Sequence, residues 1–213
     1  MDEKIVIGLF GVVLGFFLNF FKDISTARQT RKREAEYLAI RMICIFESFM
    51  DSCAAVVGDD GLYYGQTDED GHHRVQVKTP DLELELKDVN WKSFSPQLMY
   101  EILYFPSLVK EANSFISSTF EFAASPPEFS EGFEERQYQY STLGLRAAEI
   151  TQKLRKQYNI PKNHITSWDM VKYMLNEKKK INKLRLDREK AHEERNASLH
   201  NKSMQPTADA SAD

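Results

Sequence analysis

The stretch from Ile5 to Phe21 reads IVIGLFGVVLGFFLNFF and decides the architecture of the chain. It holds seventeen residues without a charge, and Asn19 is its single polar side chain. As a helix it covers roughly 26 Å at about 1.5 Å per residue, slightly less than a hydrocarbon core of about 30 Å. Lys4 and Lys22 flank the run, and lysine stems can reach the lipid headgroups. The run predicts a transmembrane anchor over residues 1–22.

Two other interpretations of this run are possible. A secretory signal peptide has a basic start, a shorter apolar region and a small-residue cleavage site. This chain starts with MDEK, and only Ser25 and Ala27 resemble such a site. A buried core helix normally keeps a polar stripe, and this run has none. The length and apolar character of the run therefore favour an anchor over both alternatives.

Basic residues near the ends of a span set its orientation, whereas acidic residues count little. Lys4 stands alone before the run, and five basic residues follow it: Lys22, Arg28, Arg31, Lys32 and Arg33. This asymmetry predicts a short N-terminus outside the cell (inner) membrane and a cytoplasmic C-terminal domain. The same residues could attract anionic lipid, at about 1 kcal/mol each. Their role as a topology signal is the simpler interpretation.

Three glycines lie near one face of the predicted anchor: Gly8, Gly11 and Gly15. Gly11 and Gly15 form a G-x-x-x-G pair, and small residues four positions apart let membrane helices pack closely. Glycine is also common in membrane helices that have no such role. We therefore expect the lipid bilayer as a partner, with a homodimer through this face as a further hypothesis.

Composition limits what the rest of the chain can be. At 213 residues there is room for one ordinary domain beside the anchor. The net charge of −4 argues against a general nucleic-acid binder. Cys44 and Cys53 fall on one predicted helix, roughly 13 Å apart, which is beyond disulfide reach. Free thiols suit a reducing cytosol.

The pattern after the anchor predicts a helical bundle. Neither glycine nor proline occurs from Phe16 to Val57, so one helix could leave the bilayer and continue through residues 23–57. Residues 93–176 supply the other bundle helices, and Pro106 should kink or split the first of them. Apolar residues at spacings of three and four predict this core: Leu38, Met42, Phe49, Ile102, Val109, Ile116, Leu143, Ile150 and Leu154.

Residues 58–92 break the helical pattern. They form a loop rich in glycine and acidic residues, followed by alternating apolar residues from Val75 to Leu86 that predict a small β-hairpin. The fold class is therefore mainly α, an N-terminal membrane helix continuing into a cytosolic bundle of about four helices with a hairpin insertion.

Residues 177–213 are predicted to be a charged, solvated helix that fades into a disordered tail. Thirteen of the nineteen residues from Glu177 to Arg195 are charged, too many for a buried face. The last ten residues, Met204–Asp213, resemble the tails appended to reading frames in bacterial mobile gene cassettes. This resemblance implies an origin and no activity.

The sequence predicts no catalytic, cofactor-binding or metal-binding residue. His72 and His73 follow three acidic residues, but glycine-flanked loop residues of this kind are usually plain surface. The run His192–Glu194 lacks the second histidine of a zinc-protease motif. The segment Glu134–Tyr140 could line a groove, although tyrosines also mark the passage of a helix from core to solvent.

We therefore expect a single-pass membrane protein whose bundle is a non-catalytic binding or scaffolding module for an unknown cytosolic protein. One alternative is a membrane-anchored effector or enzyme that draws its acids from Glu134, Glu135 or the His72 loop. Another is a sensor of anionic lipid through Arg28–Arg33. Nucleic acid is not an expected partner, because acidic residues dilute the basic helix Lys178–Lys190 and no aromatic residues interleave with it.

Overall fold

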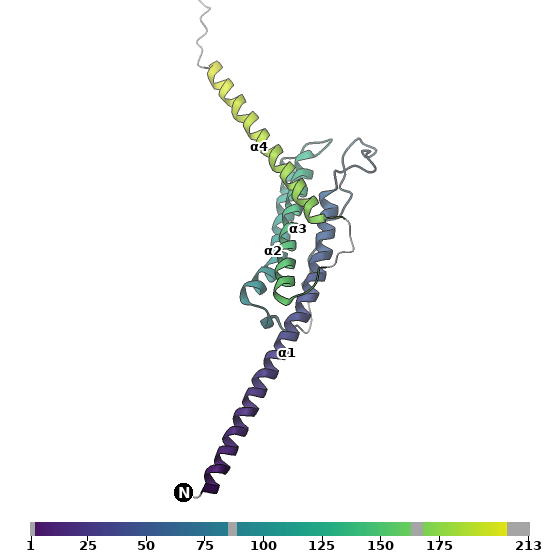
Figure 1. Ribbon diagram of the computed structural model, residues 1–213. Coiled ribbons are helices and arrows are strands. Elements are labelled where there is room, and N and C mark those ends of the chain that lie inside the picture. The colour runs from purple at the N-terminus through teal and green to yellow at the C-terminus, as the bar shows by residue number, and fades with distance from the viewer. Residues whose placement is uncertain (1–2, 85–88, 163–167, 204–213) are drawn as a thin grey trace, which may run out of the picture. The chain divides into compact units, whose positions relative to one another are not determined.

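The described part of the computed structural model is mainly helical and confirms the expected α bundle (Figure 1). The backbone is described for residues 3–84, 89–162 and 168–203, and the side chains for residues 14–84, 89–162 and 168–200. Within these ranges there are four α-helices, one short 3-10 helix and no strand: α1 (Glu3–Val57), η1 (Trp91–Ser93), α2 (Pro96–Phe122), α3 (Ser130–Tyr158) and α4 (Met170–Ser203).

Helix α1 runs without interruption from Glu3 to Val57, as the lack of glycine and proline after Gly15 predicts. It ends at Gly58, whose amide donates to the Ala54 carbonyl at 3.1 Å. All nine residues predicted for the core are buried. The spacing of three and four was therefore a correct guide to the face that each helix buries.

The side chains of the predicted anchor are described only in part. No helix in the part with described side chains is long and apolar enough to span a membrane. Residues 5–13 of the predicted span lie outside that part, and Gly8 and Gly11 are among them. The anchor stays a prediction.

The helices contribute to two compact units. Unit 1 comprises residues 1–50, 81–110 and 146–167, and unit 2 comprises residues 51–80, 111–145 and 168–213. Each of α1, α2 and α3 supplies residues to both units, whereas α4 belongs to unit 2.

In unit 1, α1 and α2 run parallel. The Asn90 side chain, shortly before α2, donates to Glu34 at 3.0 Å, and Phe105 meets Phe46 with ring centroids 5.1 Å apart. Helix α3 joins them through two ion pairs, Lys153–Glu101 and Arg155–Glu47, each at 2.6 Å. The buried apolar residues of this unit include Leu38, Met42, Phe46, Phe49, Leu98, Ile102, Phe105, Ile150 and Leu154.

In unit 2, α3 is antiparallel to both α2 and α4. The Tyr140 hydroxyl donates to the Asn113 side chain at 2.8 Å, and Phe120 and Phe133 meet edge to face at 5.5 Å. Met174 of α4 packs on Gly144, where a Cβ would lie only 2.9 Å from the methionine methyl carbon. A larger residue at this position of α3 would therefore require the Met174 side chain to move.

The predicted hairpin is not formed in residues 75–84, and Leu86 lies outside the described residues. The Gln76 and Val77 amides donate to the Asp59 carboxylate at 3.0 and 2.9 Å, so they cannot join a cross-strand ladder. The alternation of Val75 and Val77 indicated a strand, but a side-chain acceptor takes the place of the partner strand.

One other expectation needs correction. Helix α2 continues through Pro106, so a split at this proline is wrong. At the charged end of the chain, α4 continues to Ser203, and the side chains of residues 186–200 are exposed. The tail Met204–Asp213 lies outside the described residues.

Candidate functional site

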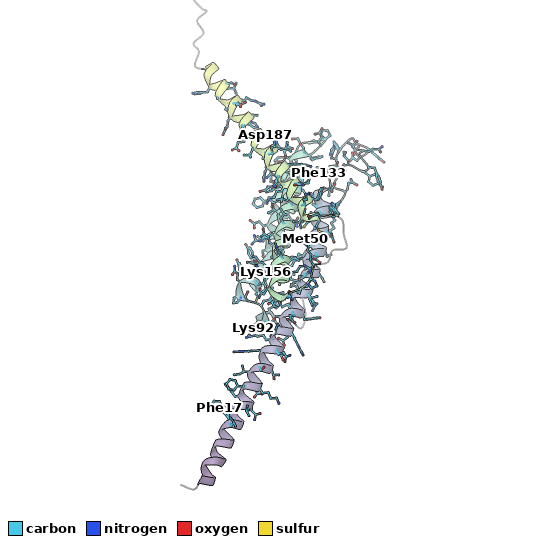
Figure 2. The ribbon with its side chains drawn as sticks, viewed as in Figure 1. Phe17, Met50, Lys92, Phe133, Lys156 and Asp187 are labelled. Carbon is cyan, nitrogen blue, oxygen red and sulfur yellow. The ribbon has the colours of Figure 1, made fainter. Side chains whose placement is uncertain are left out.

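The N-terminal part of α1 carries apolar side chains that contact little other protein. Among the described side chains, six large apolar ones on this part are more than half exposed: Leu14, Phe16, Phe17, Leu18, Phe20 and Phe21. Figure 2 labels Phe17 on this part of the helix. At about 100° per residue these side chains cover an arc of about 200° around α1, and Gly15 and Asn19 lie in the remaining arc. Large exposed apolar side chains over so wide an arc need an apolar surrounding, either lipid or protein.

The next turns of α1 are basic. Lys22, Arg28, Arg31, Lys32 and Arg33 are all exposed. Lys32 pairs with Glu36 at 3.7 Å. In the described part of the chain, no hydrogen bond or ion pair involves Arg28, Arg31 or Arg33. Three guanidinium groups are therefore available to an anion from outside the chain.

An open groove of about 520 Å³ lies in unit 1 beside this basic segment. Arg28 and Arg31 line it from α1, together with the apolar side chains of Ile24 and Ala27. The groove also contains the Asn90–Glu34 hydrogen bond, which holds the chain before η1 against α1. The groove therefore combines apolar lining residues with two unpaired cations.

The face predicted for close helix packing is described only at Gly15. A Cβ built there would meet no atom within 4 Å, so this side of α1 is open. Gly8 and Gly11 lie outside the described side chains.

A buried ion pair lies in unit 2, where the sequence indicated no site. Arg136 of α3 meets Asp59 at 2.6 Å, and the two side chains are 2% and 1% exposed. Asp59 also accepts the Gly61 amide at 3.0 Å, besides the two amides of Gln76 and Val77. Arg136 donates in addition to the Val77 carbonyl. The pair therefore fastens both ends of the loop 59–77 to α3.

The hydrogen bonds of Asp59 decide its protonation. Burial alone would raise the pKa of this carboxyl group, but the Val77 and Gly61 amides and the Arg136 guanidinium outweigh burial and lower the pKa below its ordinary value. The carboxylate therefore stays ionised at neutral pH, with its bonds directed to the loop and to α3. This arrangement organises the fold of the loop.

The acidic loop gathers three potential metal ligands, Asp68, Asp70 and His72, whose ligand atoms lie within 4.8 Å of one another. Asp68 already accepts the His72 amide at 2.7 Å and the Arg74 side chain at 2.5 Å. The Arg74 bond is the largest cause that lowers the pKa of Asp68. A cation here would compete with Arg74, and we assign no metal to this loop.

The segment Glu134–Tyr140 packs against α4. Arg185 donates to Glu134 and Glu135 at 2.9 and 2.7 Å, and Arg188 also binds Glu134. The Arg185 guanidinium lies 4.4 Å from the ring centre of Tyr138. These contacts engage Glu134 and Glu135, two of the acids from which the enzyme alternative could draw, with arginines of α4.

The Asp59–Arg136 pair was missed because 77 residues separate its partners. One signal could have found it: Arg136 occupies a core position between Phe133 and Tyr140, where an arginine needs a buried partner. No family model, curated protein or solved structure matches this chain.

Proposed function

We propose that this chain is a single-pass membrane protein that holds a non-catalytic helical binding module at the cytoplasmic side of the cell membrane. The observation that carries the proposal is the continuity of α1. One helix contains both the exposed apolar residues 14–21 and core residues of unit 1 such as Leu38 and Met42. Whatever surrounds the apolar end therefore fixes the location of the bundle.

Lipid is the surrounding that fits best. Transferring a phenylalanine or leucine side chain out of water is favourable by about 1.5–3 kcal/mol. Six such side chains stand exposed on residues 14–21, so a lipid environment would stabilise this end by roughly 10 kcal/mol. The sequence adds residues 5–13, also uncharged, and the five basic residues that favour a cytoplasmic bundle.

The binding role rests on aromatic residues that unit 1 does not bury. Tyr100, Leu103 and Tyr104 of α2 are exposed, and the two tyrosine rings stack with centroids 5.5 Å apart. Tyr37 and Ile40 of α1 are exposed as well. Tyrosine is enriched in protein–protein interfaces, where it offers a large apolar body with a polar end. The partner proposed for these surfaces is a cytosolic protein.

Membrane fractionation of the full chain tests the location. The wild type should stay with membranes after an alkaline carbonate wash and be released by detergent. Leu14→Lys/Phe17→Lys should move the chain to the soluble fraction, because each lysine near a span centre costs about 2.5–3.5 kcal/mol. Tyr37→Lys/Ile40→Lys, which adds the same charges beyond the span, should stay with membranes.

Three results would overturn the proposal. The first is a wild-type chain that the alkaline wash releases. The second is a mature N-terminus after Ala27, which identifies a cleaved signal peptide. The third is digestion of the bundle by protease added to intact cells, which places it outside.

Self-association through the glycine face extends this proposal and has its own test. Cys44 is exposed on α1 and can report a second copy by thiol crosslinking. Gly11→Ile/Gly15→Ile should lower the crosslinked yield severalfold, since bulky side chains prevent close helix approach. An unchanged yield would remove the homodimer hypothesis and leave the anchor intact.

A further inference from the structure

We propose that the groove lined by Arg28 and Arg31 seats the headgroup phosphate of an anionic phospholipid from the cytoplasmic leaflet. The acyl chains of the same lipid lie along the phenylalanine side chains of α1. This inference rests on the proposed membrane anchor, and it assigns two of the five basic residues to a site rather than to a diffuse charge.

The groove and the phenylalanines lie on one side of α1. At about 100° per residue, Phe17, Phe20 and Phe21 fall within about 50° of the mean direction of Arg28 and Arg31. Gly15, Lys22 and Arg33 fall about 150–170° away from that direction. A lipid on the phenylalanine side would therefore meet Arg28 and Arg31 and leave the glycine side free.

The depth of the two arginines suits a headgroup. Arg28 and Arg31 lie six and nine residues beyond Lys22, about 9 and 14 Å along the helix axis. The headgroup layer extends about 5–8 Å beyond the hydrocarbon core. Helical side chains tilt toward the N-terminus, which here is the membrane side, and arginine has a long stem. Both guanidinium groups can therefore reach back to the phosphate level.

Arg28 and Arg31 have no carboxylate partner in the described part of the chain. Some basic residues of the bundle are paired, as in Lys153–Glu101, Arg155–Glu47 and Arg185–Glu134. Guanidinium groups bind phosphate oxygens through paired hydrogen bonds, so two of them beside one groove favour a phosphate over a single inorganic counter-ion.

The other groove residues fit the same ligand. Ile24 and Ala27 line the groove on the N-terminal side of Arg28, which faces the proposed membrane, where the glycerol end of a lipid would lie. Glu34 is the single acid among the lining residues. It lies one turn further from the membrane than Arg31, and its carboxylate accepts the Asn90 amide. The membrane end of the groove is thus positive, and its single carboxylate lies at the far end, where it accepts a hydrogen bond from Asn90.

The test uses the purified full chain in phosphatidylcholine nanodiscs that contain a minor fraction of phosphatidylglycerol. The measured quantity is the enrichment of phosphatidylglycerol retained with the protein over its fraction in the disc. Arg28→Ala/Arg31→Ala is compared with Lys22→Ala/Arg33→Ala, which also removes two positive charges but from the opposite side of the helix. The first variant should lose enrichment roughly tenfold and the second less than twofold.

The outcomes separate this inference from the proposed function. Equal losses in the two variants would show diffuse electrostatic attraction and overturn the groove. Displacement of phosphatidylglycerol by millimolar inorganic phosphate would also overturn it, since the site would then be a free-phosphate site. Failure of the wild type to enter nanodiscs would instead refute the anchor. Equal circular dichroism of both variants controls for folding.

Discussion

Replacing Arg136 with methionine should be among the most destabilising single changes in unit 2. It removes the 2.6 Å contact to Asp59 and leaves that carboxylate, 1% exposed, without its counter-charge. Breaking a buried ion pair by removing one partner typically costs about 3–5 kcal/mol. A domain has about 5–15 kcal/mol of stability in total. Methionine keeps an unbranched apolar stem, so the loss measures the charge rather than the packing.

Two further variants locate the effect. Asp59→Ala should cost at least as much as Arg136→Met, because it also removes the acceptor for the Gln76 and Val77 amides. Arg74→Met makes the same substitution at an ion pair whose arginine is 60% exposed, and should leave stability nearly unchanged.

Denaturant unfolding of the full chain in detergent micelles, followed by far-ultraviolet circular dichroism, measures the loss. Hydrogen exchange with mass spectrometry reports on the loop at the same time. The Gln76 and Val77 amides should exchange faster in Arg136→Met and Asp59→Ala than in Arg74→Met. Similar stability losses in Arg136→Met and Arg74→Met would refute the role given to the buried pair.

Three other results are expected. The pKa of Asp59 is lowered in the folded chain, so the stability that its carboxylate contributes is complete above the unfolded-state pKa of about 3.9 and is lost as pH falls through the folded-state pKa. The stability advantage of the wild type over Asp59→Asn should therefore shrink below about pH 4. An unchanged advantage there would count against the ion pair. Gly61→Ala should lower the free energy of unfolding by about 2 kcal/mol or more in the same assay, because Gly61 has φ +81° and a Cβ would lie 2.7 Å from the Phe133 ring. A variant as stable as the wild type would contradict this expectation. Maleimide should label exposed Cys44 in the folded chain and leave Cys53 unlabelled, because burial shields the Cys53 thiol and raises its pKa. Peptide mass mapping measures the labelling of each cysteine. Rapid labelling of both cysteines would contradict the burial of Cys53.

The helical fold could be predicted because apolar periodicity is a local property. Residues such as Leu38, Met42, Ile102 and Leu154 recur every three or four positions, and each is buried as expected. The prediction of a hairpin was wrong for the opposite reason. Val75 and Val77 have the period of a strand, but a distant acceptor, Asp59, takes the amides on which a strand depends.

The charges of the candidate groove could be predicted from the sequence, but its shape could not. The basic residues after the predicted anchor stand out in the sequence. The distinction between Arg31 and Arg33 requires the groove, and the groove requires Asn90, which reaches α1 from a remote part of the chain. Long-range side-chain pairing leaves no periodic trace. This is also why Arg136 could be recognised only as an arginine in an apolar position.

The uninterrupted backbone of α1 has a mechanical consequence. A helix with no hinge transmits torsion, so turning its apolar N-terminal end about the axis would turn Tyr37 and Ile40 with it. Inserting one alanine after Ala27 would rotate those side chains by about 100° relative to residues 14–21 and move them by about 1.5 Å along the axis. The direction in which Tyr37 points is therefore set by the orientation of a part of α1 that lies many residues away.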